Sequence, residues 1–129
     1  MSIALMGSLL WAAPSHAKGD GEKNFRAGNK LLREGKLDQA LTELNKAIAA
    51  NPKLAKAYRD RGLVYEKQSK LELAVKDFTK SISFNPQDSL TYNNRGGAYL
   101  KQGDLKKARA DLQKSIALIN QVLSRPCLK

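Results

Sequence analysis

The sequence predicts an all-α fold, an α-solenoid of three stacked helix-turn-helix hairpins (six helices) with a short C-terminal extension. Three observations support this prediction. The stretch Ala55–Asp88 recurs when it is shifted by 34 positions in either direction. Each copy holds two segments whose apolar residues follow helical spacing, and a short polar break separates the two. A fixed period between about 20 and 50 residues is typical of arrays in which each unit packs only on its neighbours.

The three copies are residues 21–54, 55–88 and 89–122, followed by a tail at residues 123–129. Several positions coincide in all three copies: Gly28, Gly62 and Gly96; Leu37, Leu71 and Leu105; Ala40, Ala74 and Ala108; and Ile48, Ile82 and Ile116. Glycine inside a helix costs roughly 1 kcal/mol relative to alanine. Glycine at one position of every copy therefore indicates that two helices approach closely, and we expect the recurrent alanines to lie opposite the glycines.

The middle copy shows how each element is recognised. Tyr58, Gly62 and Tyr65 lie at i, i+4 and i+7, which predicts a first helix over about residues 54–68. Leu71, Ala74, Val75, Phe78 and Ile82 form the apolar stripe of a second helix over about residues 71–83.

Polar breaks and helix ends recur with the same period. The breaks within the copies are Gly35-Lys36, Ser69-Lys70 and Gly103-Asp104. Asn85-Pro86 ends the second helix of the middle copy, because the residue before a proline is driven out of the helical region. Asp88 or Ser89 is then expected to cap the following helix.

This pattern resembles the tetratricopeptide repeat. The residues that carry the resemblance are, in the middle copy, Tyr58, Gly62, Tyr65, Ala74, Phe78, Ser81 and Pro86. The third copy matches with Tyr92, Gly96, Tyr99, Ala108, Leu112 and Ser115, and the first with Phe25 (one residue late), Gly28, Leu31, Ala40, Leu44, Ala47 and Pro52. The resemblance implies a non-enzymatic module for protein–protein interaction.

The charge and composition of the chain restrict the kinds of partner and chemistry that we expect. The 129 residues include 23 Lys and Arg against 12 Asp and Glu, a formal net charge of +11. Such a charge favours acidic partners, whether a protein or peptide, a polymer or a membrane surface. A single cysteine and a single histidine allow no disulfide framework and no Cys/His metal site within one chain. No catalytic constellation is visible, the acidic residues being scattered over helix surfaces, so we expect neither an enzyme nor a cofactor.

The chain termini differ from the repeats. Residues 1–17 contain no charged residue and hold an apolar run that ends in Ser15-His16-Ala17. This composition is typical of a secretory signal peptide cleaved after Ala17, although no Lys or Arg precedes the apolar run. We therefore expect export to a bacterial periplasm or an equivalent lumen; without such a signal the protein would be cytoplasmic. Residues 18–20 are predicted to form a linker, with Asn24 capping or entering the first helix.

The resemblance also implies a binding groove lined by the first helix of each repeat. The positions carried over are Phe25, Arg26, Asn29 and Arg33 in the first repeat; Lys56, Arg59, Asp60, Leu63 and Lys67 in the second; and Leu90, Asn93, Asn94, Gly97 and Lys101 in the third. This surface is mostly basic, partly apolar and carries amides. It suits an extended or helical peptide with acidic groups.

Within this groove Arg26, Lys56 and Arg59 are predicted to face one concavity. Like charges held together cost stability unless Asp60 or a bound anion relieves them. We therefore expect an acidic ligand to be held there by Arg26 and Arg59.

One subfamily of these repeats grips the carboxylate at the end of a chaperone with two Asn and three basic residues. Only Asn29 fits that pattern in the first register; Phe25, Asp60, Leu90 and Asn94 stand at the other positions. Shifting the register by one repeat recovers only Arg59 and Asn94. The sequence therefore argues against that clamp.

Other surfaces offer alternatives. The second helices carry Lys46, Lys76, Lys80, Lys106, Lys107, Arg109 and Lys114, and these residues would bind an anionic membrane or acidic polymer through the convex face. Nucleic acid is less favoured, because no aromatic residues are placed to stack on bases. The last helix is expected to run to about Ser124, before Pro126. Ile116, Ile119, Val122 and Leu123 would then form an incompletely covered apolar face, a candidate for self-association unless the tail covers it. Cys127 is an unpaired cysteine in this tail.

Overall fold

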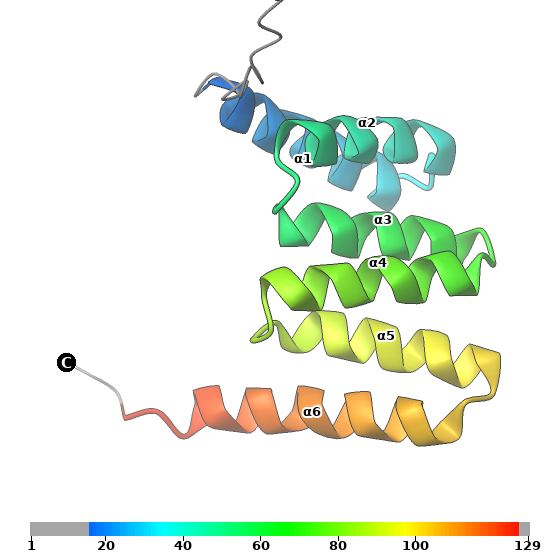
Figure 1. The fold of residues 1–129 in the computed structure, drawn as a ribbon, viewed down its shortest axis with the longest axis vertical. Coiled ribbons are helices and arrows are strands. Elements are labelled where there is room, and N and C mark those ends of the chain that lie inside the picture. Colours follow the sequence, from blue (N-terminus) through cyan, green and yellow to red (C-terminus); the bar gives the residue numbers. More distant parts are fainter. Residues whose placement is uncertain (1–15, 127–129) are drawn as a thin grey trace, which may run out of the picture.

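The structure is a computed structural model that describes residues 16–126, with side chains from residue 19 onward. Six α-helices and no strand occur among these residues (Figure 1). The helices are α1 (His16–Arg33), α2 (Leu37–Ala50), α3 (Ala55–Lys67), α4 (Leu71–Phe84), α5 (Ser89–Gln102) and α6 (Leu105–Leu123). The predicted all-α array of three hairpins is confirmed. In the middle copy, the predicted ends lie within one residue of the observed ones.

The hairpins stack so that the array has two different sides. Each first helix packs on the second helix of its own hairpin, and α2 and α4 also pack on the first helix that follows. The first helices α1, α3 and α5 contact one another in sequence, whereas α2, α4 and α6 make no mutual contact. The first helices therefore form the inner side of a curved stack and the second helices its outer side.

The glycine repeat marks close approach within each hairpin, but its partner differs from the prediction. A Cβ atom at Gly62 would stand 2.6 Å from Cε1 of Phe78, and one at Gly28 would stand 2.7 Å from Cγ of Leu44. Gly96 receives Leu112 in the same way, at 3.0 Å. The expectation that alanines lie opposite these glycines is thus wrong for Gly28 and Gly62, and at Gly96 only the backbone carbonyl oxygen of Ala108 comes near, at 3.4 Å. Each glycine makes room for a large side chain of the second helix, while the alanines are fully buried nearby.

The core consists of two clusters that meet on α3. The first is centred on Leu32, Leu44 and Val64, and the second on Phe78 and Ala98. Leu63 packs against both clusters. The three hairpins therefore form one continuous apolar interior.

The turns and caps follow the predicted breaks. Ser69 adopts a φ of 63°, close to the 78° and 82° of Gly35 and Gly103 at the equivalent turns. A positive φ is costly for a residue with a Cβ, so the second turn carries local strain that the glycine turns avoid. Asp88 caps α5, accepting a hydrogen bond from the backbone N–H of Leu90 at 3.1 Å.

The start of α1 differs from the prediction. The helix begins at His16, so residues 18–20 are helical and do not form a linker. Asn24 consequently lies inside the helix, where it donates a hydrogen bond to Glu43 of α2 at 2.8 Å and caps nothing. Residues 1–15, which make up most of the predicted signal segment, and Cys127 lie outside the described residues.

At the other end, α6 runs to Leu123 with Ser124 as its C-cap, as predicted. It is the longest of the three second helices and extends beyond α5 (Figure 1). Among the described helices, none combines the length and the apolar character needed to cross a membrane.

Candidate partner-binding face

The inner side begins with a contact between the first two hairpins. Lys56 on α3 forms an ion pair with Glu22 on α1, and its Nζ lies 4.7 Å from the centre of the Phe25 ring. Lys56 and Glu22 are 34 residues apart, so they occupy equivalent positions of successive repeats. Two of the predicted groove residues, Phe25 and Lys56, are therefore brought together. The charge of Lys56 is already paired within the chain.

A polar network continues along α3. Asp60 is 1% exposed and accepts hydrogen bonds from Nδ2 of Asn29 at 2.7 Å and from Nε of Arg59 at 3.3 Å. Arg59 also pairs with Asp88 at the start of α5, with 3.2 Å between Nη1 and Oδ2. These four residues tie the first helices of all three repeats together. Their role is therefore structural, because they hold neighbouring first helices together.

This network corrects two expectations for the groove. Asp60 is buried under Asn29 and Arg59 and does not face a ligand. Arg59 and Lys56 already have carboxylate partners, so no stored repulsion awaits an anion from outside. Replacing Arg59 would remove a partner from a buried carboxylate, so we expect that change to lower the stability of the fold.

Arg26 lies elsewhere. It stands 34 residues before Asp60, at the position that in α3 is buried towards α1. With Lys23 and Lys30 it forms a row on α1 at i, i+3 and i+7, and all three are exposed. In α3 the equivalent residues Ala57, Asp60 and Val64 are all buried. Arg26 therefore belongs to the end of the stack, at the border of the inner side.

A row of cations remains available along the inner side. Arg33, Lys67 and Lys101 recur at intervals of 34 residues, each in the last turn of a first helix, and all three are exposed. Cations in the last turn also interact favourably with the helix dipole. Lys101 contacts Glu66 with 2.5 Å between the charged atoms, yet its side chain stays 57% exposed.

The third repeat supplies an open, less charged section of the same side. Leu90 is 58% exposed, Asn93 is exposed and Asn94 is half-buried. A Cβ atom at Gly97 would meet nothing within 4 Å, in contrast to Gly62. Gly97 occupies the position of Asn29 and Leu63 in the earlier repeats. The inner side of α5 therefore has free space in front of its backbone.

Two recurrent pairs on the outer side were missed by the sequence reasoning. The guanidinium group of Arg61 donates two hydrogen bonds to Asp77, from Nε to Oδ2 at 2.7 Å and from Nη2 to Oδ1 at 2.9 Å. Arg95 binds Asp111 in the same way, at 2.7 and 2.8 Å. Both aspartates are buried, so the expectation that acidic residues lie scattered over helix surfaces fails for them. The signal was present, because both members of the pair recur after 34 residues with the same separation of 16.

Aromatic rings frame each of these arginines. The guanidinium carbon of Arg61 lies 5.6 Å from the ring centre of Tyr58 and 6.0 Å from that of Tyr65. Arg95 is placed likewise between Tyr92 and Tyr99. The hydrogen bonds that these arginines donate to the aspartates raise the pKa of both arginines above the usual value, against the opposing effect of burial. Both groups therefore stay charged, and they hold each second helix onto its first.

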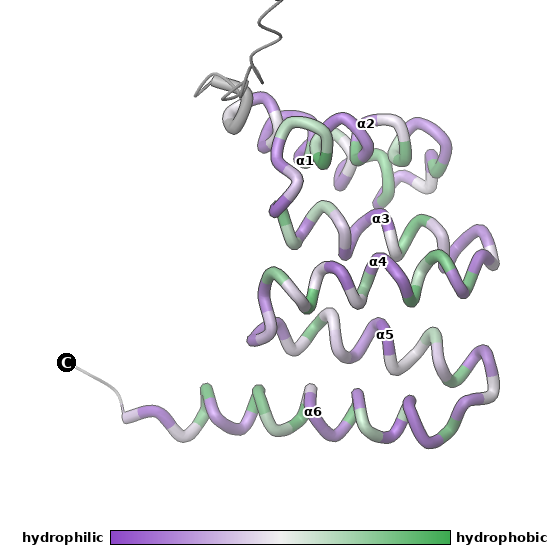
Figure 2. Tube along the Cα trace, in the orientation of Figure 1, coloured by the Kyte–Doolittle hydropathy of each residue, from purple (hydrophilic) through white to green (hydrophobic). Residues whose placement is uncertain are grey.

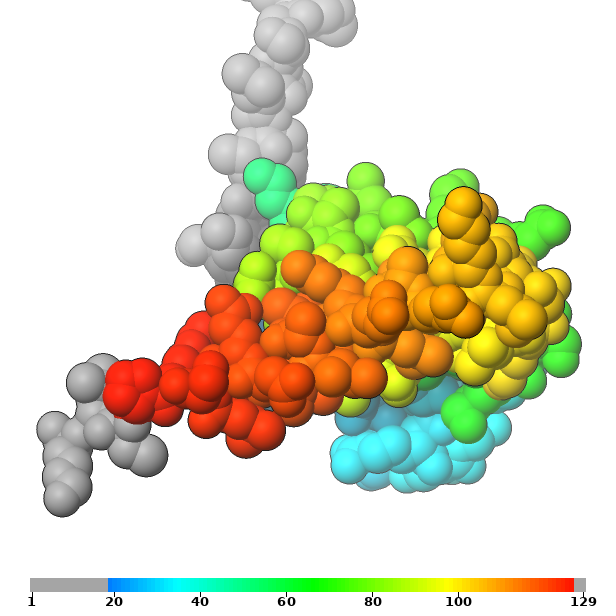
Figure 3. Space-filling model, turned by 90° about the horizontal axis from the view of Figure 1, so that it is seen from below, coloured from blue at the N-terminus to red at the C-terminus, as the bar shows by residue number. Residues whose placement is uncertain are grey.

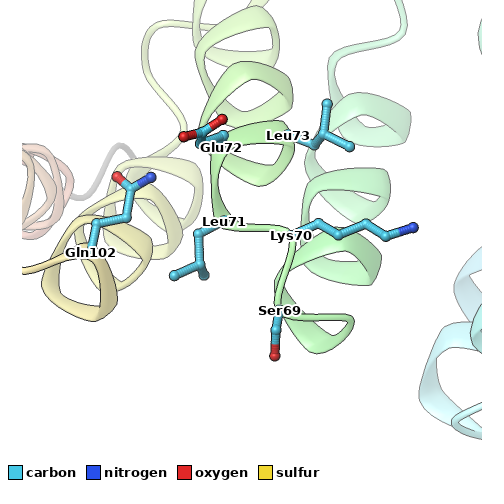
Figure 4. A pocket seen from close by; sticks show the side chains of 6 residues that line it. All are labelled: Ser69, Lys70, Leu71, Glu72, Leu73 and Gln102. Atoms are coloured by element: carbon cyan, nitrogen blue, oxygen red, sulfur yellow. The ribbon is translucent and has the colours of Figure 1, made fainter.

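Two surface hollows lie away from the predicted groove. One, of about 510 Å³, lies where the second turn meets the end of α5; its lining residues are Ser69, Lys70, Leu71, Glu72, Leu73 and Gln102 (Figure 4). The side chains of Lys70 and Glu72 point in different directions (Figure 4). The other, of about 470 Å³, surrounds the Arg61–Asp77 pair, whose carboxylate is already bound. Neither hollow gathers free polar groups around one point. In the described part of the chain, no group of three or more acidic, His or Cys residues could hold a metal ion.

Sequence models of known repeats match this architecture. Models described as tetratricopeptide or TPR repeats match residues 28–69, 55–88 and 78–110. The chain belongs to the tetratricopeptide repeat (TPR) family. Members of this family are typically non-catalytic interaction modules, so the chain is a module for protein–protein interaction. A comparison with curated protein sequences finds no match.

Several solved structures superpose well on this chain. The second TPR of Spaghetti (RPAP3), bound to the HSP90 peptide SRMEEVD, is 30% identical with a TM-score of 0.76; the match covers 78% of this chain and 94% of that one. MamA is 25% identical with a TM-score of 0.78, and the match covers 84% of this chain and 63% of MamA. The first TPR of Spaghetti, bound to the same peptide, is 24% identical with a TM-score of 0.76, covering 78% and 80% of the two chains, which shows a shared fold.

Proposed function

We propose that this TPR domain binds an extended or helical segment of acidic character along its inner side. The observation that carries the proposal is the row of exposed cations Arg33, Lys67 and Lys101, one on each first helix. Because α1, α3 and α5 contact one another, the row follows a continuous surface. The chain as a whole carries a net charge of +11, which also favours an acidic partner. Similar domains of Spaghetti bind the acidic peptide SRMEEVD.

The recognition we propose depends on side-chain carboxylates and not on the terminal carboxylate of the peptide. Asn29, the one residue that fits a terminal-carboxylate clamp in the first register, is occupied by Asp60. Leu63 and Leu90 offer apolar contact beside the cations, and Asn93 and Asn94 offer amides to the backbone of the ligand. The partner is therefore expected to combine acidic and apolar residues.

Fluorescence anisotropy with a labelled SRMEEVD peptide tests the proposal. We expect binding that falls at least about tenfold when the acidic side chains are replaced by amides, a loss of about 1.4 kcal/mol. Amidation of the terminal carboxylate should change the affinity less than about twofold. The protein variant Arg33→Gln/Lys67→Gln should lose affinity in the same way. The control Lys76→Gln/Lys80→Gln, on the outer side of α4, should not. No measurable binding, or equal loss in both protein variants, would contradict the proposal.

An alternative is adhesion of the outer side to anionic membranes or acidic polymers. The observation that favours it is that the cations of the second helices are all exposed: Lys46, Lys76, Lys80, Lys106, Lys107, Arg109 and Lys114. Salt separates the two ideas, because attraction between exposed charges is screened beyond about 8–10 Å at physiological ionic strength, whereas the apolar contacts of Leu63 and Leu90 on the inner side are not weakened in this way. Inner-side recognition should persist at moderate salt, whereas adhesion to anionic vesicles should disappear.

We also propose that the protein is exported and that residues 1–17 are removed. The support is the composition of this segment, which contains no charged residue in a chain that is 27% charged. N-terminal sequencing of the protein from its native host tests the idea. A mature chain that starts at Met1 in the cytosol would refute it without bearing on the binding face.

A further inference from the structure

The last helix carries an apolar face that its two counterparts do not expose. Ile116 on α6 is 58% exposed, whereas the equivalent Ile48 and Ile82 are half-buried. Ile48 packs against the cluster that includes Ala57 and Val64 of the following helix, α3. Among the described residues no helix follows α6. Figure 3 shows it crossing this end of the molecule without another described element over it.

The exposed face has a regular pattern. Ile116, Ile119 and Leu123 lie at intervals of three and four, the spacing of a heptad seam. Figure 2 shows apolar colour recurring along α6. Ile119 is 46% exposed, Val122 60% and Leu123 76%. The exposed part amounts to on the order of 400 Å², within the roughly 300–600 Å² of the largest apolar patch on a typical monomer, and such a patch is often functional.

Charge decides what can cover this face. Residues 115–124 contain no charged side chain, although 27% of the whole chain is charged. The centre of this half, around Ile116 and Ile119, could therefore face a second α6 without bringing like charges together. At the other end of the stack, α1 presents the exposed row Lys23, Arg26 and Lys30. An apolar α6 could cover that row only by desolvating three cations, so head-to-tail stacking is disfavoured.

We propose that two copies of this chain pair through α6, antiparallel and around a twofold axis. Ile116 of each copy then faces Ile119 of the other. In this register Arg125 of one copy lies level with position 110 of the other, so Arg125 and Arg109 come near each other at both ends of the contact. Their repulsion is a cost that the apolar contact must exceed, and salt reduces it. The closed pair leaves both inner sides free, because α6 belongs to the outer side of the stack.

The area of the apolar face on α6 limits the affinity of the dimer. Pairing two such patches buries on the order of 800 Å², below the roughly 1,200–2,000 Å² of stable complexes. We therefore expect a weak, reversible dimer with a dissociation constant on the order of 100 μM. Such a dimer would add avidity towards a partner that carries two binding segments.

Sedimentation velocity of the full chain tests the pairing over about 5–500 μM. The mass should rise with concentration from 14.2 kDa towards twice that value and no further. The variant Ile116→Lys/Ile119→Lys should remain a monomer, with circular dichroism confirming its helices. The control Leu73→Lys/Leu100→Lys replaces two similarly exposed leucines, 43% and 48% exposed, outside the patch and should dimerise as the original chain does.

A mixing experiment tests the register. Ile116→Glu and Ile119→Lys should each be monomeric alone, but a mixture of the two should associate, because position 116 faces position 119 of the second copy. A monomeric original chain at every concentration, or dimers that survive the double lysine change, would overturn the proposal. Higher oligomers that keep growing with concentration, or a mixture that stays monomeric, would overturn the twofold arrangement.

Discussion

The ring of Phe78 fills the space directly in front of the Cα atom of Gly62. A Cβ atom at position 62 would stand 2.6 Å from Cε1 of that ring, a distance that real contacts essentially never show. Gly97, also inside a first helix, would meet nothing within 4 Å. The two glycines thus allow the steric requirement to be separated from helix propensity.

The variant Gly62→Ala should be destabilised by about 1–3 kcal/mol, because Phe78 or the helix itself must move. Gly97→Ala should be stabilised by up to about 1 kcal/mol, since alanine is the better helix former and has room. Urea unfolding followed by circular dichroism measures both changes. Similar effects of the two substitutions would show that the contact with Phe78 is unimportant.

The Arg61–Asp77 pair gives a second prediction. Asp77 is 5% exposed and depends on Arg61 for both of its oxygens, so Arg61→Met should cost about 3–5 kcal/mol. Asp77→Ala should cost less, because Arg61 keeps its bond to Asn45 and its access to water. A double-mutant cycle should give a coupling of about 1–3 kcal/mol. The exposed pair Lys46–Glu43 is the control, with at most about 0.5 kcal/mol expected. Equal couplings would contradict the structural role of burial.

The repeat made the hairpins predictable, because three copies of one pattern restrict helix, turn and cap together. Phe78 and its equivalents illustrate the limit of that pattern. The period showed that glycine at Gly62 needs a close neighbour, but it did not show which side chain of α4 turns towards it. That choice depends on how the two helices are rotated against each other.

The start of α1 could not be predicted for a different reason. Residues 18–21 contain two glycines and two charges, which locally favour a linker. In the structure a Cβ atom at Gly21 would lie 3.3 Å from the carbonyl oxygen of Ala47 and from Cβ of Ala50. Residues 18–21 have a weak intrinsic tendency to form a helix, but Gly21 packs closely on α2, and this segment is helical. The partners of Lys56 and Arg59 were missed in a similar way, because Glu22 lies on another repeat and Asp88 lies 29 residues further along the chain, at the start of α5.

Asp88 provides a third prediction, because it combines two roles. It accepts hydrogen bonds from the backbone N–H of Leu90 and the hydroxyl of Thr91, and it pairs with Arg59. Asp88→Ala should cost about 1–2 kcal/mol through loss of the cap. Asp88→Asn should cost less, because an amide oxygen still caps the helix. Melting temperatures in low and high salt measure the difference. If Asp88→Asn destabilises the fold as much as Asp88→Ala does, the contribution of Asp88 to stability comes from the ion pair alone.

The Asn24–Glu43 contact gives a prediction about pH. The hydrogen bond from Asn24 lowers the pKa of Glu43, and Lys46 adds to the shift. A carboxyl whose pKa is lower in the folded state stabilises the fold above its unfolded pKa, and this contribution is lost as the pH falls through the folded value. The stability difference between the original chain and Asn24→Ala should therefore be constant near neutral pH and shrink below about pH 4.5. Unfolding curves at several pH values measure it, and a difference that widens on acidification would contradict the contact.

The last prediction uses Gly97 to alter the charge of the inner side without disturbing the fold. A glutamate there would lie four residues before Lys101, the spacing at which Glu and Lys stabilise a helix by about 0.2–0.5 kcal/mol. Because a side chain at position 97 has free space, Gly97→Glu should fold at least as stably as the original chain. It should also place a carboxylate beside the row Arg33, Lys67 and Lys101. Binding of the SRMEEVD probe should then weaken at least about fivefold, whereas Gly97→Arg should tighten it and Gly97→Gln, the uncharged control, should fall between the two. If all three variants bind equally well, the acidic segment does not lie along α5, and the binding face must be sought on the outer side.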